Sequence, residues 1–503
     1  MPTSISDLPL ELLPDLLRPL VRRADLYNVC LVCRDWSIVG QSLLYRWIRL
    51  FGKDLAIAGL LFGTLASTRR LAKLVRRLEV RVYPLSNRVK ERRAMEELAI
   101  DMLKNCENVE ELVWTRKGAL TDDVFETIVT LPRLHTFELN AHTNLSPGSW
   151  SASHLVNLPR LRSLSLILPD RNIANILPEF LERQRKLASS CDSDEPLPGA
   201  SLEEFSILCR ESTIVNDRVI SSIVPHLSNG SLRSLGLAGC SKLTGKPLLD
   251  LLPHLPHLEN LALEACNFDP SFYSLAAPSL STLKSLKLTH PGPRHPTLPR
   301  FFPSLETLLQ HTLRLTAFTL YYTGASSGGT REWPTVSHDF ISNLTQTVGS
   351  HLRKFELSGV LIDVDAVQGL TSGSRGIKDL VLHLGEHFDL AHLTTCFAPL
   401  HELRTLHILS QRADVTPSDV LSLAEQCSPT LRQIGFRNRV WILRRAYVRN
   451  DETGQHEIKI RFIETASAFG AFRRNKYGAE EDVNVEEDLD PREEESSSEE
   501  DEE

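Results

Sequence analysis

The chain has 503 residues, of which 42% are hydrophobic, and its formal net charge is −8. This apolar content is ordinary for globular domains, but the longest apolar stretch, around Leu55–Leu65, is too short to span a bilayer. The start, MPTSISDLP, lacks the pattern of a secretion signal, and the nine cysteines lack the spacing of a disulfide framework. We therefore expect reduced thiols, a cytoplasmic or nuclear location and no membrane partner.

Residues 5–50 begin with a helix start and continue through three short apolar segments. Leu8-Pro9 marks the start of the first helix, and Ser6 or Asp7 can cap it. The apolar residues of the three segments are Leu12, Leu13, Leu16, Leu17 and Leu20; Leu26, Val29, Cys30, Val32 and Cys33; and Leu43, Leu44, Tyr45 and Trp47. So much apolar surface in so small a module predicts a partner that covers it.

Two details of this module need separate predictions. Pro14 falls inside the first helix, where a proline costs about 3 kcal/mol, so we expect a kink or a restart of the helix at Pro14. Cys30 and Cys33 have the spacing of a redox or metal motif, but no second Cys/His pair is close in the sequence. We expect both thiols on one helix face, inside the apolar stripe.

A pattern of the form L-x-x-L-x-L, with some apolar substitutions, recurs through the middle of the chain. Most steps between successive copies are 25–28 residues, which is the period of a leucine-rich repeat. Each L-x-L predicts a short strand whose two apolar residues point into a stacked core. The first positions of the copies are Val75, Val109, Leu134, Leu161, Leu202, Leu232, Leu258, Leu283, Leu315, Leu352, Ile377, Leu403 and Leu431.

Segments with helical spacing lie between the predicted strands. Met95–Leu103 has apolar residues at helical intervals, and Pro417–Ala424 begins with a proline that suits a first helical turn. The longer steps contain stretches rich in turn formers, which predict surface loops. These stretches are Ser189–Ser201, Thr289–Pro303 and Thr323–Thr335.

The pattern changes after the last repeat. Val440–Arg449 and His456–Glu464 are rich in strand formers and flank the turn Asn450–Gly454, so they predict a hairpin that caps the open end of the repeats. Residues 479–503 then hold fifteen acidic residues and one arginine, which predicts a disordered, solvated tail. Ser496–Ser498 precede acidic residues and suit an acid-directed kinase, although a solubilising tail is the favoured interpretation.

The N-terminal module resembles an F-box. The matching elements are Leu8-Pro9-x-Glu11-Leu12-Leu13, Asp25-Leu26, Val32-Cys33-Arg34-Asp35-Trp36 and Leu43-Leu44-Tyr45. An F-box followed by leucine-rich repeats is a known family architecture, and the chain up to about residue 465 resembles its fungal-type members. We therefore predict an α/β fold with an all-α F-box module (1–50), a horseshoe-shaped solenoid (51–436), a hairpin cap (437–470) and a disordered acidic tail (471–503).

The resemblance implies a function. F-box proteins dock onto the Skp adaptor of a Skp–cullin–F-box ubiquitin ligase, and their repeats hold a protein substrate, whose identity the sequence does not indicate. The chain would then be a non-catalytic subunit without a cofactor, because other subunits supply the chemistry. The residues implied for adaptor binding are Leu8, Pro9, Leu12, Leu13, Leu16, Leu26, Val29, Val32, Cys33 and Trp36.

A substrate would bind the concave face of the repeats, which is a frequent binding face of solenoids. Residues beside the paired apolar positions of a strand face this side. The candidates are Glu264, Lys287, Tyr321, Glu356, His383, His407 and Arg437. They are chemically mixed, so they indicate no particular ligand.

Other functions have weaker support in the sequence. His383, Glu386 and His387 match a zinc-peptidase motif, but His383 follows a predicted strand and Gly385 favours a turn, whereas the motif requires a helix. Basic pairs such as Arg69-Arg70 are dispersed and lack interleaved aromatics, so nucleic-acid binding is not expected. The remaining alternative is a scaffold or small-GTPase regulator, although the catalytic Arg or Asn loop of a GTPase activator is not recognisable.

Overall fold

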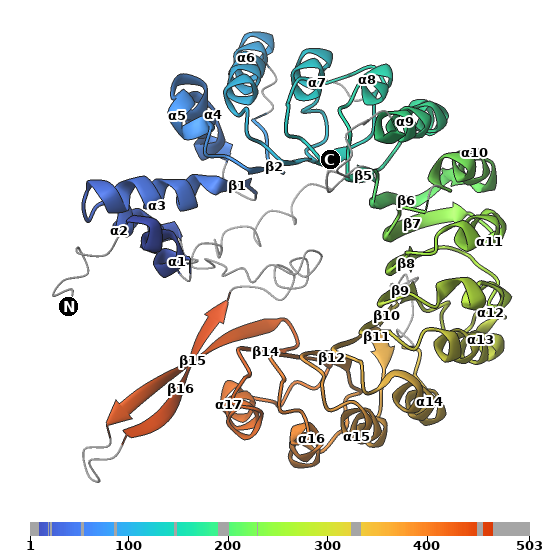
Figure 1. The fold of residues 1–503 in the computed structure, drawn as a ribbon. Coiled ribbons are helices and arrows are strands. Elements are labelled where there is room, and N and C mark those ends of the chain that lie inside the picture. Colours follow the sequence, from blue (N-terminus) through green and yellow to red (C-terminus); the bar gives the residue numbers. More distant parts are fainter. Residues whose placement is uncertain are drawn as a thin grey trace, which may run out of the picture. The chain divides into compact units, whose positions relative to one another are not determined.

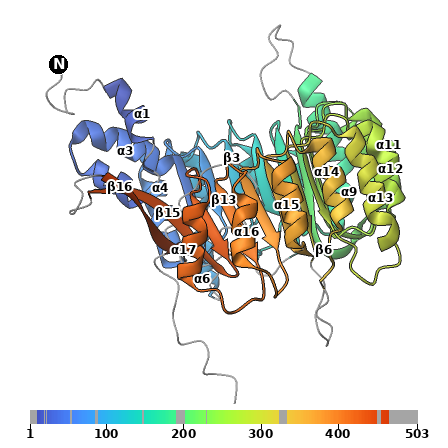
Figure 2. The same cartoon turned by 90° about the horizontal axis from the view of Figure 1, so that it is seen from below.

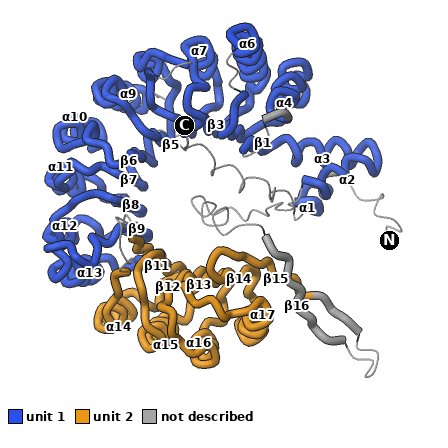
Figure 3. The backbone as a smooth tube through the Cα atoms, turned by 180° about the vertical axis from the view of Figure 1, so that it is seen from behind, with its two compact units in different colours: residues 1–315 blue, residues 316–503 orange. Residues whose placement is uncertain are grey.

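The computed structural model describes residues 10–18, 20, 23–51, 55–84, 88–144, 148–189, 201–228, 230–322, 333–449 and 456–465. The chain divides into two compact units, residues 1–315 and residues 316–503 (Figure 3). No helix among the described residues is long and apolar enough to cross a membrane.

Unit 1 begins with a small helical module (Figure 1). Its elements are η2 (Leu10–Leu12), α1 (Leu13–Leu17), α2 (Arg23–Cys30) and α3 (Arg34–Arg46). Leu13, Leu17, Val29 and Val39 form its buried core, and Leu20, Trp36 and Leu43 pack against this core. Pro14 lies in the first turn of α1, where its missing N–H needs no partner. Of the two predicted outcomes, a restart of the helix is therefore confirmed.

The rest of unit 1 is a parallel sheet whose neighbouring strands follow one another in the chain. The strands are β1 (Trp47–Leu50), β2 (Arg77–Val80), β3 (Glu111–Trp114), β4 (Thr136–Asn140), β5 (Ser163–Ile167), β6 (Glu204–Asn216), β7 (Ser234–Lys242), β8 (Asn260–Glu264) and β9 (Ser285–Thr289). Helical segments connect them and cover one face of this sheet (Figure 1). These are α4 (Leu55–Ser67), α5 (Arg69–Ala72), α6 (Val89–Asn105), α7 (Asp122–Val129), α8 (Ser153–Val156), α9 (Arg171–Ser189), α10 (Asp217–Leu227), α11 (Lys246–Leu251), η3 (Leu252–His254), α12 (Ser271–Ala276), η4 (Ala277–Leu280) and α13 (Leu298–His311).

Unit 2 repeats this plan. Its parallel strands are β10 (Ala317–Tyr321), β11 (Lys354–Leu361), β12 (Asp379–His383), β13 (Thr405–Leu409) and β14 (Gln433–Phe436). The helices α14 (His338–Val348), α15 (Val364–Gly373), α16 (Leu390–Phe397) and α17 (Pro417–Gln426) follow one another in chain order (Figure 2). β15 (Arg439–Arg449) pairs antiparallel with β14, and β16 (His456–Thr465) pairs antiparallel with β15. The predicted hairpin strands are therefore confirmed, and their role as a cap stays a prediction.

The core consists of the apolar positions of the repeat. All thirteen predicted first positions are no more than 6% exposed, and each lies two residues before a strand of the series β2–β14. The complete repeat that begins at Leu232 shows the pattern in detail, because Leu235, Leu237, Cys240 and Leu243 are also buried. The predicted leucine-rich-repeat architecture is thus confirmed within each unit. Each repeat covers the apolar face of its neighbour, because a single repeat cannot bury its own apolar face.

Two predicted boundaries differ from the structure. β1 lies within residues 1–50, which we expected to be wholly helical; Ile48 and Leu50 are buried as in any repeat strand. The predicted loop Thr289–Pro303 is wrong beyond Thr297, because α13 begins at Leu298. Pro299 occupies the first turn of α13. Pro303 has no N–H to donate back to that exposed turn, so the helix loses one hydrogen bond there. Phe301 and Leu305 are buried on the inner face of the helix. The other predicted loops fall largely on residues 190–200 and 323–332, which lie outside the described residues.

Candidate protein-interaction site

The exposed large apolar side chains are concentrated in the N-terminal helical module. Thirteen such side chains are exposed among the described residues, and six of them come from residues 12–38. These six are between 46% and 66% exposed, and we call them the N-terminal apolar surface: Leu12, Leu16, Tyr27, Leu31, Val32 and Ile38. Since α1 and α2 both pack on α3, one compact module carries all six. Exposed apolar residues gathered in this way indicate a protein interface.

The residues predicted for adaptor binding separate into two groups. Leu12, Leu16, Val32 and Cys33 are exposed and can contact a partner. The others build the module itself: Leu13, Leu26 and Val29 are buried, and Trp36 is half-buried on the core. Leu8 and Pro9 lie outside the described residues.

Sequence reasoning missed three members of the N-terminal apolar surface, namely Tyr27, Leu31 and Ile38. A signal for the first two was present. In α2 the buried residues Leu26 and Val29 are three positions apart, as expected for the inner face of a helix. Tyr27 falls off that stripe, so helical periodicity places it on an outer face, and Leu31 follows directly after the end of α2.

The two cysteines of the module do not share a helix face, so that prediction is wrong. α2 ends at Cys30, and Cys33 has an extended backbone at the start of α3, where it is exposed. Asp35 follows in the first turn of α3, a favourable place for a carboxylate. Burial raises the pKa of the Cys30 thiol, which keeps it protonated at neutral pH. Cys30 packs on Gly40, where a Cβ atom would come within 2.8 Å of its sulfur.

A buried carboxylate joins the module to the repeats. Glu79 of β2 is fully buried and lies 3.2 Å from Arg49, 2.7 Å from Arg77 and 3.1 Å from Arg81. Trp47 donates its indole N–H to Glu79 at 3.2 Å, and the guanidinium groups of Arg49 and Arg77 lie over the Trp47 ring. Burial alone raises the pKa of Glu79, but the three arginines outweigh it and hold this pKa below its usual value. The sequence signal for this cluster is the charge alternation in Arg77-x-Glu79-x-Arg81, because every second residue of an extended segment faces the same side.

Four of the predicted substrate residues are half-buried strand residues on the sheet face away from the helices. Glu264 and Lys287 lie on β8 and β9 and form an ion pair at 3.0 Å. Glu356 of β11 pairs with Lys354 at 3.0 Å and accepts a hydrogen bond from Thr319. Tyr321 is half-buried at the end of β10. A ligand on this face would meet paired charges rather than one sign of charge.

The other three predicted substrate residues are placed differently from expectation. His383 and His407 are buried, so they are not open binding residues. The His383 ring packs edge-on against Trp333 at 4.7 Å, and His407 lies 2.8 Å from the Gln433 amide with Gly435 beneath its ring. Burial lowers the pKa of His407 to about 4, although Glu356 partly opposes this shift.

Arg437 is not a strand residue, contrary to the prediction. It has a φ of 55° and lies in the tight turn between β14 and β15, where Phe436 pairs with Arg439. Hairpin turns of this length require positive φ values, because their twist must match that of the strands. The chain therefore reverses at the point where the repeat pattern predicted a further strand position.

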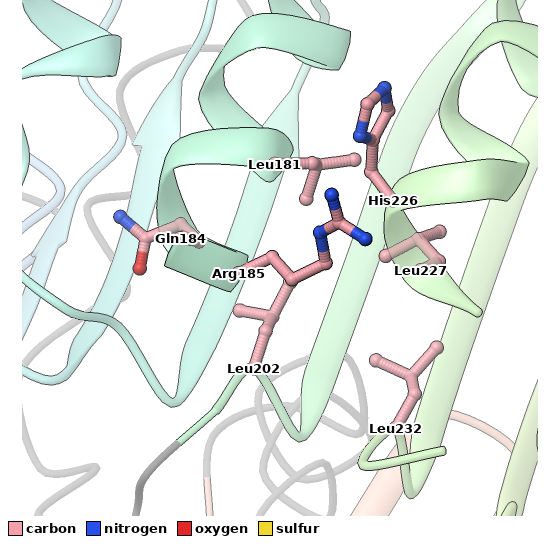
Figure 4. Close-up of a pocket in the computed structure, with 7 residues that line it drawn as sticks. All are labelled: Leu181, Gln184, Arg185, Leu202, His226, Leu227 and Leu232. Atoms are coloured by element: carbon pink, nitrogen blue, oxygen red, sulfur yellow. The ribbon is translucent and has the colours of Figure 1, made fainter. Parts of the chain in front are cut away.

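Two other kinds of site would be a metal centre and a small pocket. Within the described ranges, no group of His, Cys, Asp and Glu side chains is arranged to hold a metal ion. A small pocket lies between the ends of α9 and α10 (Figure 4), where Arg185 and His226 lie beside four leucines. Gln184 on its wall accepts from the Leu161 amide at 2.8 Å and donates to the Pro159 carbonyl at 3.1 Å. These two bonds tie α9 to the backbone of the preceding repeat, and the pocket is a gap in the packing between neighbouring repeats.

No protein-family model and no curated protein matches the sequence. Solved structures resemble the fold. One is the complex of Rad7 and Elc1 from yeast, at 16% identity and a TM-score of 0.45, with 75% of this chain and 86% of that chain covered. Another is the leucine-rich repeat-containing protein LegL7 from Legionella pneumophila, at 15% identity and a TM-score of 0.35, with 55% and 84% covered. Similarity at this level does not indicate what the chain binds.

Proposed function

We propose that this chain is the non-catalytic substrate-recognition subunit of a Skp–cullin–F-box ubiquitin ligase. The observation that carries the proposal is the N-terminal apolar surface, on a module of short helices and turns whose residues resemble an F-box. In the proposed complex this surface docks onto the Skp adaptor, and the repeats hold a protein substrate. Other subunits transfer ubiquitin, and this chain contributes proximity by raising the effective concentration of the substrate.

The exposed members of the surface determine the strength of docking in this proposal. Each apolar side chain that a partner buries completely contributes roughly 1.5–3 kcal/mol in transfer free energy. Leu31 and Val32 are the most exposed of the six and are adjacent in the turn between α2 and α3. A few anchors usually dominate an interface, and we expect these two to be among them.

The test is co-purification with a Skp adaptor. Leu31→Asp combined with Val32→Asp should lower the affinity at least about 100-fold, because two charges would enter an apolar interface without partners. Both side chains point to solvent in the free chain, so the melting temperature should stay within about 2 °C of the wild-type value. Pull-down and calorimetric titration with the purified adaptor measure the loss.

The matched control is Leu275→Asp on α12, since Leu275 is 64% exposed and lies outside the module. It should bind the adaptor like the wild type. Full binding by the Leu31/Val32 variant would contradict the proposed surface. Absence of binding by the wild type would contradict the proposed function and leave the scaffold or GTPase-regulator alternative.

A further inference from the structure

Three cysteines from successive repeats of unit 1 lie side by side. Cys209 belongs to β6, Cys240 belongs to the neighbouring strand β7, and Cys266 follows two residues after the end of the next strand, β8. The Cys240 thiol is in hydrogen-bonding contact with the thiols of both Cys209 and Cys266. All three are free cysteines, and we call them the thiol stack.

The main chain of the repeats sets the positions of these thiols. Gly239 has a φ of 66°, and a Cβ atom there would come within 2.2 Å of the Cys209 carbonyl oxygen. Glycine thus lets β7 approach the Cys209 backbone closely. On the other side of β7, the Cys266 sulfur lies 3.7 Å from the Leu237 carbonyl oxygen and also contacts the Cys240 backbone. Cys240 is therefore held between its two neighbours.

The spacing of the thiol stack allows a disulfide between neighbouring members only. Residues side by side on adjacent strands are about 4.8 Å apart, within the Cα separation of roughly 4.4–6.8 Å that a disulfide bridges. Cys209 and Cys266 are two strands apart, about 9.6 Å, which exceeds the limit of roughly 7 Å. Cys240 is therefore a member of any disulfide that forms within the stack.

The two outer thiols are the reactive ones. Cys209 and Cys266 are half-buried, whereas Cys240 is fully buried. Hydrogen bonds from the Cys240 thiol lower the pKa of both outer thiols, and the same contacts raise the pKa of Cys240. The thiolate is the nucleophile in thiol oxidation, so a small oxidant should react at an outer thiol first.

We propose that the thiol stack is a peroxide-reactive site in which Cys240 forms a disulfide with Cys209 or with Cys266. An outer thiolate attacks one oxygen of hydrogen peroxide. A sulfur–oxygen bond forms, the oxygen–oxygen bond breaks, and the hydroxide that leaves takes up a proton to become water. The product is a sulfenic acid on the outer cysteine.

Cys240 then resolves the sulfenic acid. Its sulfur attacks the outer sulfur, a sulfur–sulfur bond forms, and the hydroxyl group leaves with the Cys240 proton as a second water molecule. In total, the two thiols lose two electrons and one peroxide molecule is reduced to two molecules of water. The disulfide joins two neighbouring repeats covalently, and the remaining outer thiol can attack Cys240 and move the disulfide by one repeat. This site is independent of the N-terminal apolar surface.

Peptide mapping of the full chain by mass spectrometry tests the proposal, after titration with hydrogen peroxide and alkylation of the remaining thiols. We expect peptides that contain Cys209–Cys240 and Cys240–Cys266 disulfides, and dithiothreitol should remove both. Cys106 and Cys427 are the controls, because burial raises the pKa of each to about 12. The disulfides should form at a peroxide concentration at least about tenfold lower than the one that oxidises these two thiols.

Three serine variants test the order of the thiol stack, with circular dichroism to verify the fold. Cys240→Ser should lose both disulfides and leave the outer cysteines as sulfenic or sulfinic acids. Cys209→Ser should form only the Cys240–Cys266 disulfide, and Cys266→Ser only the Cys209–Cys240 disulfide.

Four outcomes would overturn the proposal. Two concern the wild type: no disulfide within the thiol stack, or oxidation of the stack only at the peroxide concentration that oxidises Cys106 and Cys427. The third is a Cys209–Cys266 disulfide in the Cys240→Ser variant. The fourth is a disulfide that joins isotopically labelled to unlabelled chains in a mixture, because it would show that the thiols react between molecules.

Discussion

At the scale of single residues, Glu79 shows how a buried charge is tolerated in this fold. Its carboxylate is closed off from solvent, yet three guanidinium groups and one indole N–H surround it. The pairing joins β1 and β2, the first two strands, through side chains as well as through the sheet. Removing the carboxylate would leave the cations of Arg49, Arg77 and Arg81 facing one another.

We predict that Glu79→Gln destabilises the first repeats by about 3 kcal/mol, the usual effect of breaking a buried ion pair. Hydrogen exchange of the β1 and β2 amides measures the change, which should appear as faster exchange. Glu110→Gln is the control, because Glu110 pairs with Arg76 in a half-exposed position and should contribute less than about 1 kcal/mol. Equal effects of the two substitutions would contradict the importance of burial here.

At the scale of elements, side-chain caps stabilise the starts of several helices. α17 is the clearest case, because Thr416 and Asp419 form a complete capping box, and Pro417 occupies the first turn. The Thr416 side chain accepts from the Asp419 amide at 3.3 Å, and the Asp419 carboxylate accepts from the Thr416 amide at 2.8 Å. Two otherwise unpaired backbone N–H groups are satisfied in this way.

Thr416→Ala should lower the stability of α17 by about 1 kcal/mol, because the cap is lost. Hydrogen exchange across Pro417–Gln426 should become faster in the first turn of the helix. By contrast, Thr347→Ala in α14 replaces a half-buried threonine within a helix, away from its cap, and should be neutral or slightly stabilising. A similar loss in both variants would indicate a general effect of threonine removal instead of a capping effect.

Sequence predicted those elements whose signals are local and repeated. The buried first positions, the helix around Met95–Leu103 and the strands of the terminal hairpin all follow from periodicity, and the structure confirms them. β1 was not predicted, because α3 leads directly into it and the first part of the repeat pattern is therefore missing. The start of α13 was not predicted, because Pro299 and Pro303 are typical of loops. In the structure Pro299 lies in the first turn of the helix, and Pro303 removes a single backbone hydrogen bond at an exposed turn.

The candidate site could be predicted only in part. The module as a whole was recognisable, but an apolar residue in a short helix can serve the core or the surface. Leu12 and Leu13 are neighbours of identical chemistry, yet Leu12 is exposed and Leu13 is buried. The choice depends on the angle at which α1 packs on α3, which is a tertiary property that a single sequence does not contain.

At the scale of the whole molecule, stability is expected to be distributed along the chain. Each strand pairs only with its neighbours in the sequence order, and the core residues of a repeat are covered by the adjoining repeats. In such an array, stability is approximately a sum of local terms and nearest-neighbour terms. A defect in one repeat should therefore have a limited range.

We predict that Leu237→Ala in β7 and Leu382→Ala in β12 each cost about 2–5 kcal/mol, since both side chains are fully buried. Hydrogen exchange should become faster in the altered repeat and its immediate neighbours. Leu237→Ala should leave β12–β14 unchanged, and Leu382→Ala should leave β7–β9 unchanged. Uniformly faster exchange over all strands in either variant would show that the chain unfolds as one cooperative block.

The junction between α3 and β1 has a mechanical consequence. α3 ends at Arg46 and β1 begins at Trp47, so no residue is available as a joint between them. Arg70 also donates to the Gln41 side chain at 2.9 Å, which ties α3 to α5. The helical module therefore has a fixed orientation relative to the repeats of unit 1. A partner bound to the module would take the same fixed orientation, because no flexible linker lies between α3 and β1.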